Sequence, residues 1–184
     1  MSTARDDLLE AVVAHVATSG LSDTSLRELA AAVGTSHRML LYHFGSREGL
    51  VAAIVERIET DQRVALELLA DTAAGPRELI EAQWAQLSDP ALRPFVALFF
   101  EVLALAVHRR PGTEGFLDAL TDPWLDLAEG LARGLEMRTD RDTLRLGVAV
   151  TRGLLIEVLA SGDVEPATRS LQRFLALWEA DPGR

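Results

Sequence analysis

The sequence of 184 residues contains no cysteine, no lysine and no asparagine. Without cysteine it offers no disulfide, no thiolate metal site and no cysteine nucleophile. All 18 basic residues are arginines, and 28 acidic residues outnumber them, which gives a formal net charge of −10. This acidity argues against nonspecific coating of nucleic acid, because such binding needs a positive surface. Any contact with nucleic acid must therefore be local.

Long apolar runs are also missing. The most apolar stretch, from Phe95 to Val107, is interrupted by Glu101 and is too short to span a bilayer. The first ten residues, MSTARDDLLE, are acidic before any apolar run begins, unlike a secretory signal. We therefore expect a soluble cytoplasmic protein without a membrane partner.

Apolar residues recur at helical spacing along almost the whole sequence, and no alternating strand pattern persists. The pattern predicts an all-α fold in which three short helices precede a bundle of longer ones. We expect a first helix from about Leu8 that ends at Gly20. Pro123 could divide the helix predicted over residues 113–136 in two. The later helices are predicted over residues 25–33, 36–44, 47–71, 77–88, 92–110, 113–136, 140–161 and 166–179.

Two of the short predicted helices are joined by the glycine turn in GTSHRMLLYHFGSREGL, residues 34–50. Two short helices around such a turn are typical of a helix-turn-helix motif. Thr24 is the candidate N-cap of the first helix, and Gly34 can adopt the left-handed conformation that ends it. In this motif the second helix presents its N-terminal residues to base edges in the major groove. Those residues here are Ser36, His37, Arg38 and Met39.

Each of these side chains suits a contact with DNA. Arg38 can bond a guanine with two hydrogen bonds, Met39 can touch a thymine methyl, and Arg27 could reach the same groove. Tyr42, His43 and Arg47 lie further along, where contacts with phosphates would fix orientation without reading sequence. Packing is the alternative role for Tyr42.

The segment TSLRELAAAVGTSHRMLLYHFGSREGL resembles the N-terminal domain of the tetracycline-repressor (TetR) family of transcriptional regulators. The matching positions are Thr24, Leu29, Ala30, Gly34, Ser36, Leu40, His43, Phe44, Arg47 and Leu50. The resemblance implies a DNA-binding domain at residues 1–46 and a helical ligand-binding and dimerisation domain at residues 47–184. Motif and resemblance together give these candidate DNA-binding residues: Thr24, Ser25, Arg27, Ser36, His37, Arg38, Met39, Leu41, Tyr42, His43 and Arg47.

Two positions depart from the family's pattern. Arg38 stands where the family usually has a small residue, and Leu41 stands where it usually has tyrosine. Both departures bear on which operator sequence is bound.

A band of bulky apolar residues follows in the larger predicted domain. Such a band is either core or the lining of a pocket between bundle helices, and the resemblance implies that a small-molecule inducer is held there. The candidate ligand-binding residues are Trp84, Phe95, Phe99, Phe100, Leu103 and Trp124. Glu101 faces solvent, pairs with an arginine, or contacts a polar group of the ligand.

The last two predicted helices carry an apolar surface too wide for the core of one chain, which indicates self-association. The resemblance implies a homodimer through these helices, with two recognition helices roughly 34–36 Å apart on a palindromic operator. The candidate interface residues are Gly147, Thr151, Leu154, Leu171, Phe174 and Trp178.

The prediction is therefore a ligand-responsive repressor that binds double-stranded DNA as a homodimer. No hydrolase, metalloprotease, phosphate-loop or dinucleotide motif is present, so we expect neither an enzyme nor a cofactor, and His37 and His43 are not spaced for a shared metal. The main rival is a helical small-molecule-binding or adaptor protein that has lost DNA recognition, which Leu41 and the acidity would favour.

Overall fold

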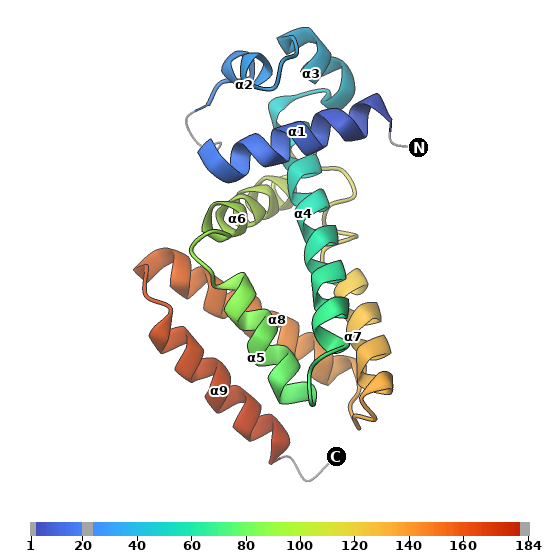
Figure 1. Cartoon of the computed structure of the whole chain (residues 1–184), viewed down its shortest axis with the longest axis vertical. Helices are drawn as coiled ribbons and strands as arrows, with labels where there is room; N and C mark the ends of the chain where they lie inside the picture. Colours follow the sequence, from blue (N-terminus) through green and yellow to red (C-terminus); the bar gives the residue numbers. More distant parts are fainter. Residues whose placement is uncertain (1–2, 20–23, 181–184) are drawn as a thin grey trace. The chain divides into compact units, whose positions relative to one another are not determined.

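The computed structural model describes residues 3–19 and 24–180, and all regular elements in these ranges are helices (Figure 1). This confirms the predicted all-α fold. The helices are α1 (Ala4–Ser19), α2 (Leu26–Ala32), α3 (His37–Phe44), α4 (Arg47–Ala70), α5 (Pro76–Leu87), α6 (Arg93–Val107), α7 (Asp122–Gly134), α8 (Arg141–Ser161) and α9 (Glu165–Glu179). None of the described helices is both long enough and apolar enough to cross a membrane. Gly20, the predicted end of the first helix, lies outside the described residues.

The helix predicted over residues 113–136 is wrong in its first part. The chain is non-helical from residue 108 to 121, and α7 begins only at Asp122. Gly112 and Gly115 have φ angles of +89° and +78°, which no right-handed helix contains. Pro123 occupies the first turn of α7, where a missing amide leaves no hydrogen bond unmade.

The chain divides into two compact units. The first comprises Met1–Thr60 and Pro94–Leu117, and the second comprises Asp61–Arg93 and Asp118–Arg184. Compactness thus groups most of α6 with α1–α3 and the first half of α4. The functional boundary expected at residue 46 stays a prediction.

The first unit has a core of aliphatic side chains from its short helices. α1 buries Val12 and Val16, α2 buries Leu29, and α3 buries Leu40. The first half of α4 adds Ile54, which is fully buried. Complete burial of side chains of this size stabilises a fold by about 1.5–3 kcal/mol each, so the short helices are held mainly by this shared core.

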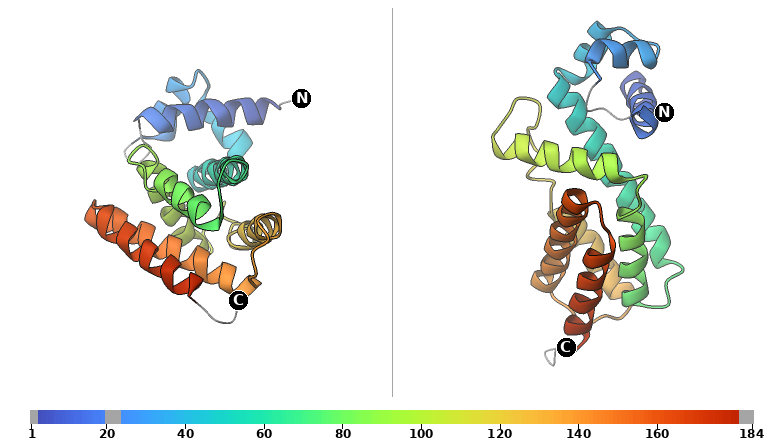
Figure 2. Two further views of the ribbon diagram at one scale, coloured as in Figure 1. Left: turned by 60° about the horizontal axis from the view of Figure 1, so that its bottom comes forward. Right: turned by 90° about the vertical axis from the view of Figure 1, so that its left-hand side faces the viewer.

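The second unit contains α5, α7, α8 and α9 together with the end of α4. α8 and α9 run antiparallel and lie side by side (Figure 2). The buried indole of Trp84 on α5 donates a hydrogen bond from Nε1 to Thr168 Oγ1 on α9, at 2.8 Å. Arg77 on α5 binds both carboxylate oxygens of Glu179 on α9. A hydrogen bond and an ion pair therefore fix α5 against α9.

Candidate nucleic-acid interface

α2 begins at a capping box. The amide of Glu28 donates to Ser25 Oγ at 3.3 Å, and the amide of Ser25 donates to Glu28 Oε2 at 2.9 Å. Hydrogen bonding of the Glu28 carboxylate with the side chain and the backbone amide of Ser25 holds the pKa of Glu28 below its usual value. The prediction of Thr24 as the N-cap is wrong by one residue. The pattern S-x-x-E at residues 25–28 satisfies two amides reciprocally, which a lone threonine does not.

The turn between α2 and α3 depends on a glycine and a serine. Gly34 has a φ of +72°, the left-handed conformation that glycine adopts without strain. Ser36 then caps α3, because its Oγ accepts a hydrogen bond from the amide of Met39 at 3.2 Å. The predicted second helix of the motif is thus confirmed, one residue shorter at its start.

α3 has one buried side and one exposed side. Leu40 and Phe44 are buried in the first unit, whereas Tyr42 is 78% exposed and Met39 is 41% exposed. Tyr42 therefore does not pack in the core, which removes the alternative role predicted for it. Arg38 is also exposed, so α3 presents a cation, a thioether and a phenol to solvent.

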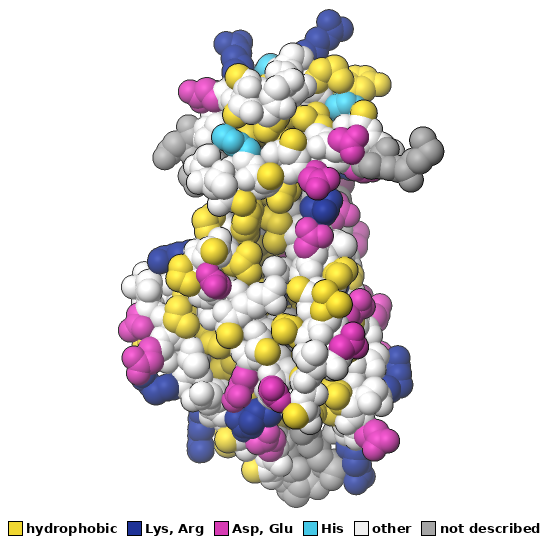
Figure 3. Space-filling model, viewed as in Figure 1, with side chains coloured by type: hydrophobic (Ala, Val, Ile, Leu, Met, Phe, Trp, Pro, Cys, Tyr) yellow, Lys and Arg dark blue, Asp and Glu magenta, His cyan; other side chains and the backbone are white. Residues whose placement is uncertain are grey.

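The remaining predicted DNA-binding residues surround this surface. Arg27, Ser25 and Ser36 are exposed, and four others are half-buried: Thr24, His37, Leu41 and His43. In Figure 3 arginine and histidine side chains appear on the surface over α2 and α3. Within the described residues neither Arg27 nor Arg38 has a carboxylate partner within ion-pair distance. Both cations are therefore available to an external anion.

Arg47 is placed differently from the other cations. Its Nη1 lies 3.6 Å from Oε1 of Glu101 on α6, and both residues belong to the first unit. Of the three roles expected for Glu101, pairing with an arginine is confirmed, and the side chain also faces solvent. The partner is 54 positions away in the sequence, so no local pattern could have identified it.

The predicted ligand-binding residues fall in both units. Phe95 and Phe99 are buried on α6 and Phe100 and Leu103 are half-buried, all in the first unit. Trp84 on α5 is buried and Trp124 on α7 is half-buried, both in the second unit. The guanidinium of Arg63 lies 5.7 Å from the ring centroid of Trp124. No group of described His, Asp or Glu residues is arranged to hold a metal ion.

The predicted dimer residues are mostly covered within their own chain. Leu171 is 2% exposed, so its side chain belongs to the core of the second unit. The other five are half-buried: Gly147, Thr151, Leu154, Phe174 and Trp178. The hydroxyl of Thr151 donates to the carbonyl of Gly147 on its own helix, at 3.0 Å.

The apolar residues that α8 leaves exposed form a different set, which the sequence analysis missed. They recur at alternating spacings of three and four residues, which places them on one face of the helix. This exposed stripe consists of Leu146, Ala149, Gly153, Ile156 and Ala160. The spacing is visible in the sequence, but apolar residues also occur on other sides of α8, so periodicity alone could not single out this stripe.

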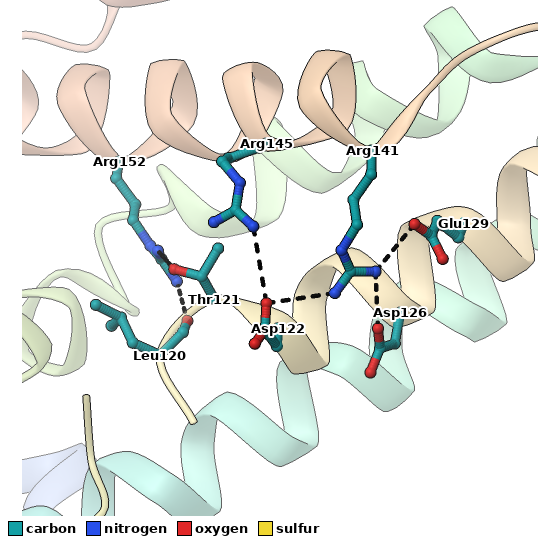
Figure 4. A network of polar contacts seen from close by, with 8 residues as sticks. All are labelled: Leu120, Thr121, Asp122, Asp126, Glu129, Arg141, Arg145 and Arg152. Atoms are coloured by element: carbon teal, nitrogen blue, oxygen red, sulfur yellow. Dashed lines mark hydrogen bonds and ion pairs between the residues drawn. The ribbon is translucent and has the colours of Figure 1, made fainter. Parts of the chain in front are cut away.

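Another face of α8 is fixed to α7 by arginines (Figure 4). Arg141 Nη1 lies 2.9 Å from both Asp126 and Glu129, and its Nη2 lies 3.3 Å from Asp122. Arg152 donates to the carbonyl of Leu120 and to Thr121 Oγ1, just before α7 begins. Arg141 of α8 therefore partly neutralises the acidic side chains of α7.

Comparisons with known proteins agree with this geometry. The family model described as "Bacterial regulatory proteins, tetR family" matches residues 8–54, the region of the helix-turn-helix. A search of curated proteins finds no match.

Solved structures resemble the chain over almost its full length. A protein from Rhodococcus sp. assigned to the TetR family is 22% identical, with a TM-score of 0.69 over 94% of this chain and 96% of that one. A transcriptional regulator from Saccharomonospora viridis in complex with choline is 21% identical, with a TM-score of 0.66 over 94% and 95%. FadR of Thermus thermophilus, a TetR-family repressor in complex with lauroyl-CoA, is 18% identical, with a TM-score of 0.63 over 94% and 92%.

At these identities the solved structures establish a shared fold, and the family model identifies the DNA-binding motif within it. Residues 8–54 therefore match the DNA-binding region of the TetR family of bacterial regulatory proteins, and the chain shares its fold with solved structures assigned to that family.

Proposed function

We propose that the chain is a ligand-responsive repressor that reads double-stranded DNA through the exposed side of α3. The observation that carries this proposal is the division of α3 into a buried side and a solvent-exposed side. Leu40 and Phe44 fix the helix in the core, so Arg38, Met39 and Tyr42 can project without losing their position. A helix held in this way can enter a major groove and place Arg38 against a guanine.

Contacts with phosphates would supply most of the affinity. Arg27 at the start of α2 is exposed and suits this role, as does the phenol of Tyr42. Because the whole chain is strongly acidic, we expect weak binding to random DNA and a steep fall of affinity with salt.

The partner in the dimer is a second copy of the chain, docked on the exposed stripe of α8. Leu146 and Ile156 are each more than half exposed, and between them Ala149 and Gly153 lack bulky side chains. Small residues at alternating spacings of three and four allow two helices to approach closely. Leu177 of α9, which packs beside α8, adds a further exposed apolar side chain.

Sedimentation velocity tests this interface. Ile156→Glu should convert the dimer to a monomer, because it would bury two carboxylates at the twofold contact. Leu68→Glu is the matched control, since Leu68 is also apolar and more than half exposed but lies on α4. Dissociation of both variants, or of neither, would contradict the proposed interface.

The effector is a small organic molecule held by the helices that follow the helix-turn-helix. The relatives that hold choline and lauroyl-CoA support this part of the proposal. Effector and operator must weaken each other's binding by the same factor. Compounds that raise the melting temperature of the protein should therefore release it from DNA. A compound that binds the core and leaves DNA affinity unchanged would count against this gating.

The main experiment is fluorescence anisotropy with a duplex enriched from a random pool by the wild-type protein. Wild type should bind this duplex at least about a thousandfold more tightly than a shuffled one. Arg38→Ala should cost about 1–3 kcal/mol on the enriched duplex and little on the shuffled duplex. If no duplex is enriched and none binds at low salt, the rival function as a helical adaptor is favoured.

A further inference from the structure

The loop after α6 touches the first turn of α4 at a pair of glycines. Gly112 lies in the non-helical segment 108–121, and Gly49 lies in the first turn of α4. A Cβ atom built on Gly112 would be 2.6 Å from the nitrogen and 2.9 Å from the Cα of Gly49. Both distances are far below van der Waals contact. The two backbones are therefore closer than any side chain at position 112 would allow.

Neither side of this contact can yield easily. The atoms of Gly49 that a Cβ would meet belong to the backbone of a helix, so no side-chain rotation could move them away. A Cβ on Gly49 itself would overlap the carbonyl oxygen of Phe44, the last residue of α3. The hydroxyl of Ser46 adds to the restraint, since it accepts a hydrogen bond from the Gly49 amide at 3.0 Å.

The loop is itself held firmly by the first unit. Thr113 is the one buried polar residue among the described residues, and its Oγ1 donates to the carbonyl of Arg110 at 2.7 Å. The ring of Phe116 lies 6.0 Å from that of Phe99 on α6. The loop can therefore hold the first turn of α4 in place.

The two charged residues just before Gly49 also face α6 and its loop. Arg47 pairs with Glu101 of α6. The pKa of Glu48 is lowered by a hydrogen bond from its own amide, then by Ser46 and by the positive charge of Arg110 in the loop. The start of α4 thus contacts α6 through Arg47 and the loop through Gly49.

We propose that Gly112 is a positioning residue for DNA binding, because its contact with Gly49 sets where α4 begins and hence how α3 is presented. Only Gly45 and Ser46 separate the end of α3 from α4, so a shift of the first turn of α4 moves α3 with it. This inference rests on the proposed reading of DNA by α3. It assigns to a loop in the first unit, distant in sequence from the motif, a part in placing that motif.

The test compares Gly112→Ala with Gly115→Ala in the full chain. Both glycines have positive φ in the same loop, so alanine causes similar backbone strain at either position. Only at position 112 does the new Cβ meet other atoms, since nothing lies within 4 Å of a Cβ at position 115. Affinities for the enriched and shuffled duplexes are measured by anisotropy, and folding is checked by thermal melting.

We expect Gly112→Ala to lose about tenfold or more in the ratio of enriched to shuffled affinity, relative to Gly115→Ala. A merely structural role would lower the melting temperature without changing that ratio. If Gly112→Ala fails to fold, the same affinity ratio is measured for Thr113→Val. This variant loosens the loop by removing one hydrogen bond while keeping the side chain's shape. A ratio equal to that of Gly115→Ala in the folded variant overturns the role of Gly112. Failure of the wild type to enrich any duplex overturns the proposed function itself.

Discussion

Glu101 should restrain DNA binding by competing with phosphates for Arg47. Its Oε1 lies 3.6 Å from Arg47 Nη1, and the two side chains are 43% and 36% exposed. A pair this exposed contributes about 0.2–1 kcal/mol. In wild type this contribution is lost when Arg47 turns to a phosphate, which weakens DNA binding by the same amount. Glu101→Gln has no such ion pair to lose, so it should raise operator affinity by up to about fivefold per protomer.

The salt dependence gives a second readout. With Glu101 neutralised, Arg47 can take a phosphate in each protomer, so the slope of log K against log salt should become steeper by up to about 0.9 per protomer. Anisotropy titrations over about 50–200 mM salt cover the range in which such slopes are measured. Glu67→Gln is the control, because it removes one exposed negative charge from α4 without an ion-pair partner in the described structure.

Two results would refute this reasoning. If Glu101→Gln binds the enriched duplex no better than wild type, the ion pair does not compete with DNA. If Glu67→Gln gains as much affinity as Glu101→Gln, the gain reflects net charge alone.

Three further predictions concern stability. Ser25→Ala should destabilise the fold by about 1 kcal/mol in chemical denaturation. Folding lowers the pKa of Glu28 from 4.5, so the stability that its carboxylate provides should be present at neutral pH and lost when the pH falls below about 4.5. Trp84→Phe should cost about 1–2 kcal/mol, since it removes the indole donor to a hydroxyl on α9; an unchanged denaturation midpoint would show that bond to be unimportant. Arg141→Gln should lower the melting temperature more than Arg145→Gln, because Arg141 meets three carboxylates and Arg145 meets one at 3.9 Å; the difference should shrink in high salt.

Much of the motif could be predicted because its signals are local. Ser36 and Gly34 mark the turn by their own conformational preferences, and the apolar spacing of Leu40 and Phe44 marks the buried side of α3. The N-cap of α2 was misplaced only because Thr24 precedes Ser25, and the glutamate three residues later decides between them.

Other features depend on partners far away in the sequence. Apolar residues continue between Phe116 and Leu120, so periodicity alone extends a helix through a segment whose glycines have left-handed φ angles. In α8 and α9 apolar residues occur on more than one side of each helix. Periodicity therefore does not tell that Leu171 is buried while Ile156 is exposed. The contact between Gly112 and Gly49 joins two positions that no local pattern relates.

The most direct test of the account is the DNA preference selected from a random pool by wild type and by Arg38→Ala. If α3 lies in the major groove, wild type should select two symmetric half-sites about one helical turn apart. The variant should lose preference at one base pair in each half-site and keep it elsewhere. Identical preferences for the two proteins, or no preference for wild type, would contradict the assignment of α3 as the helix that reads DNA.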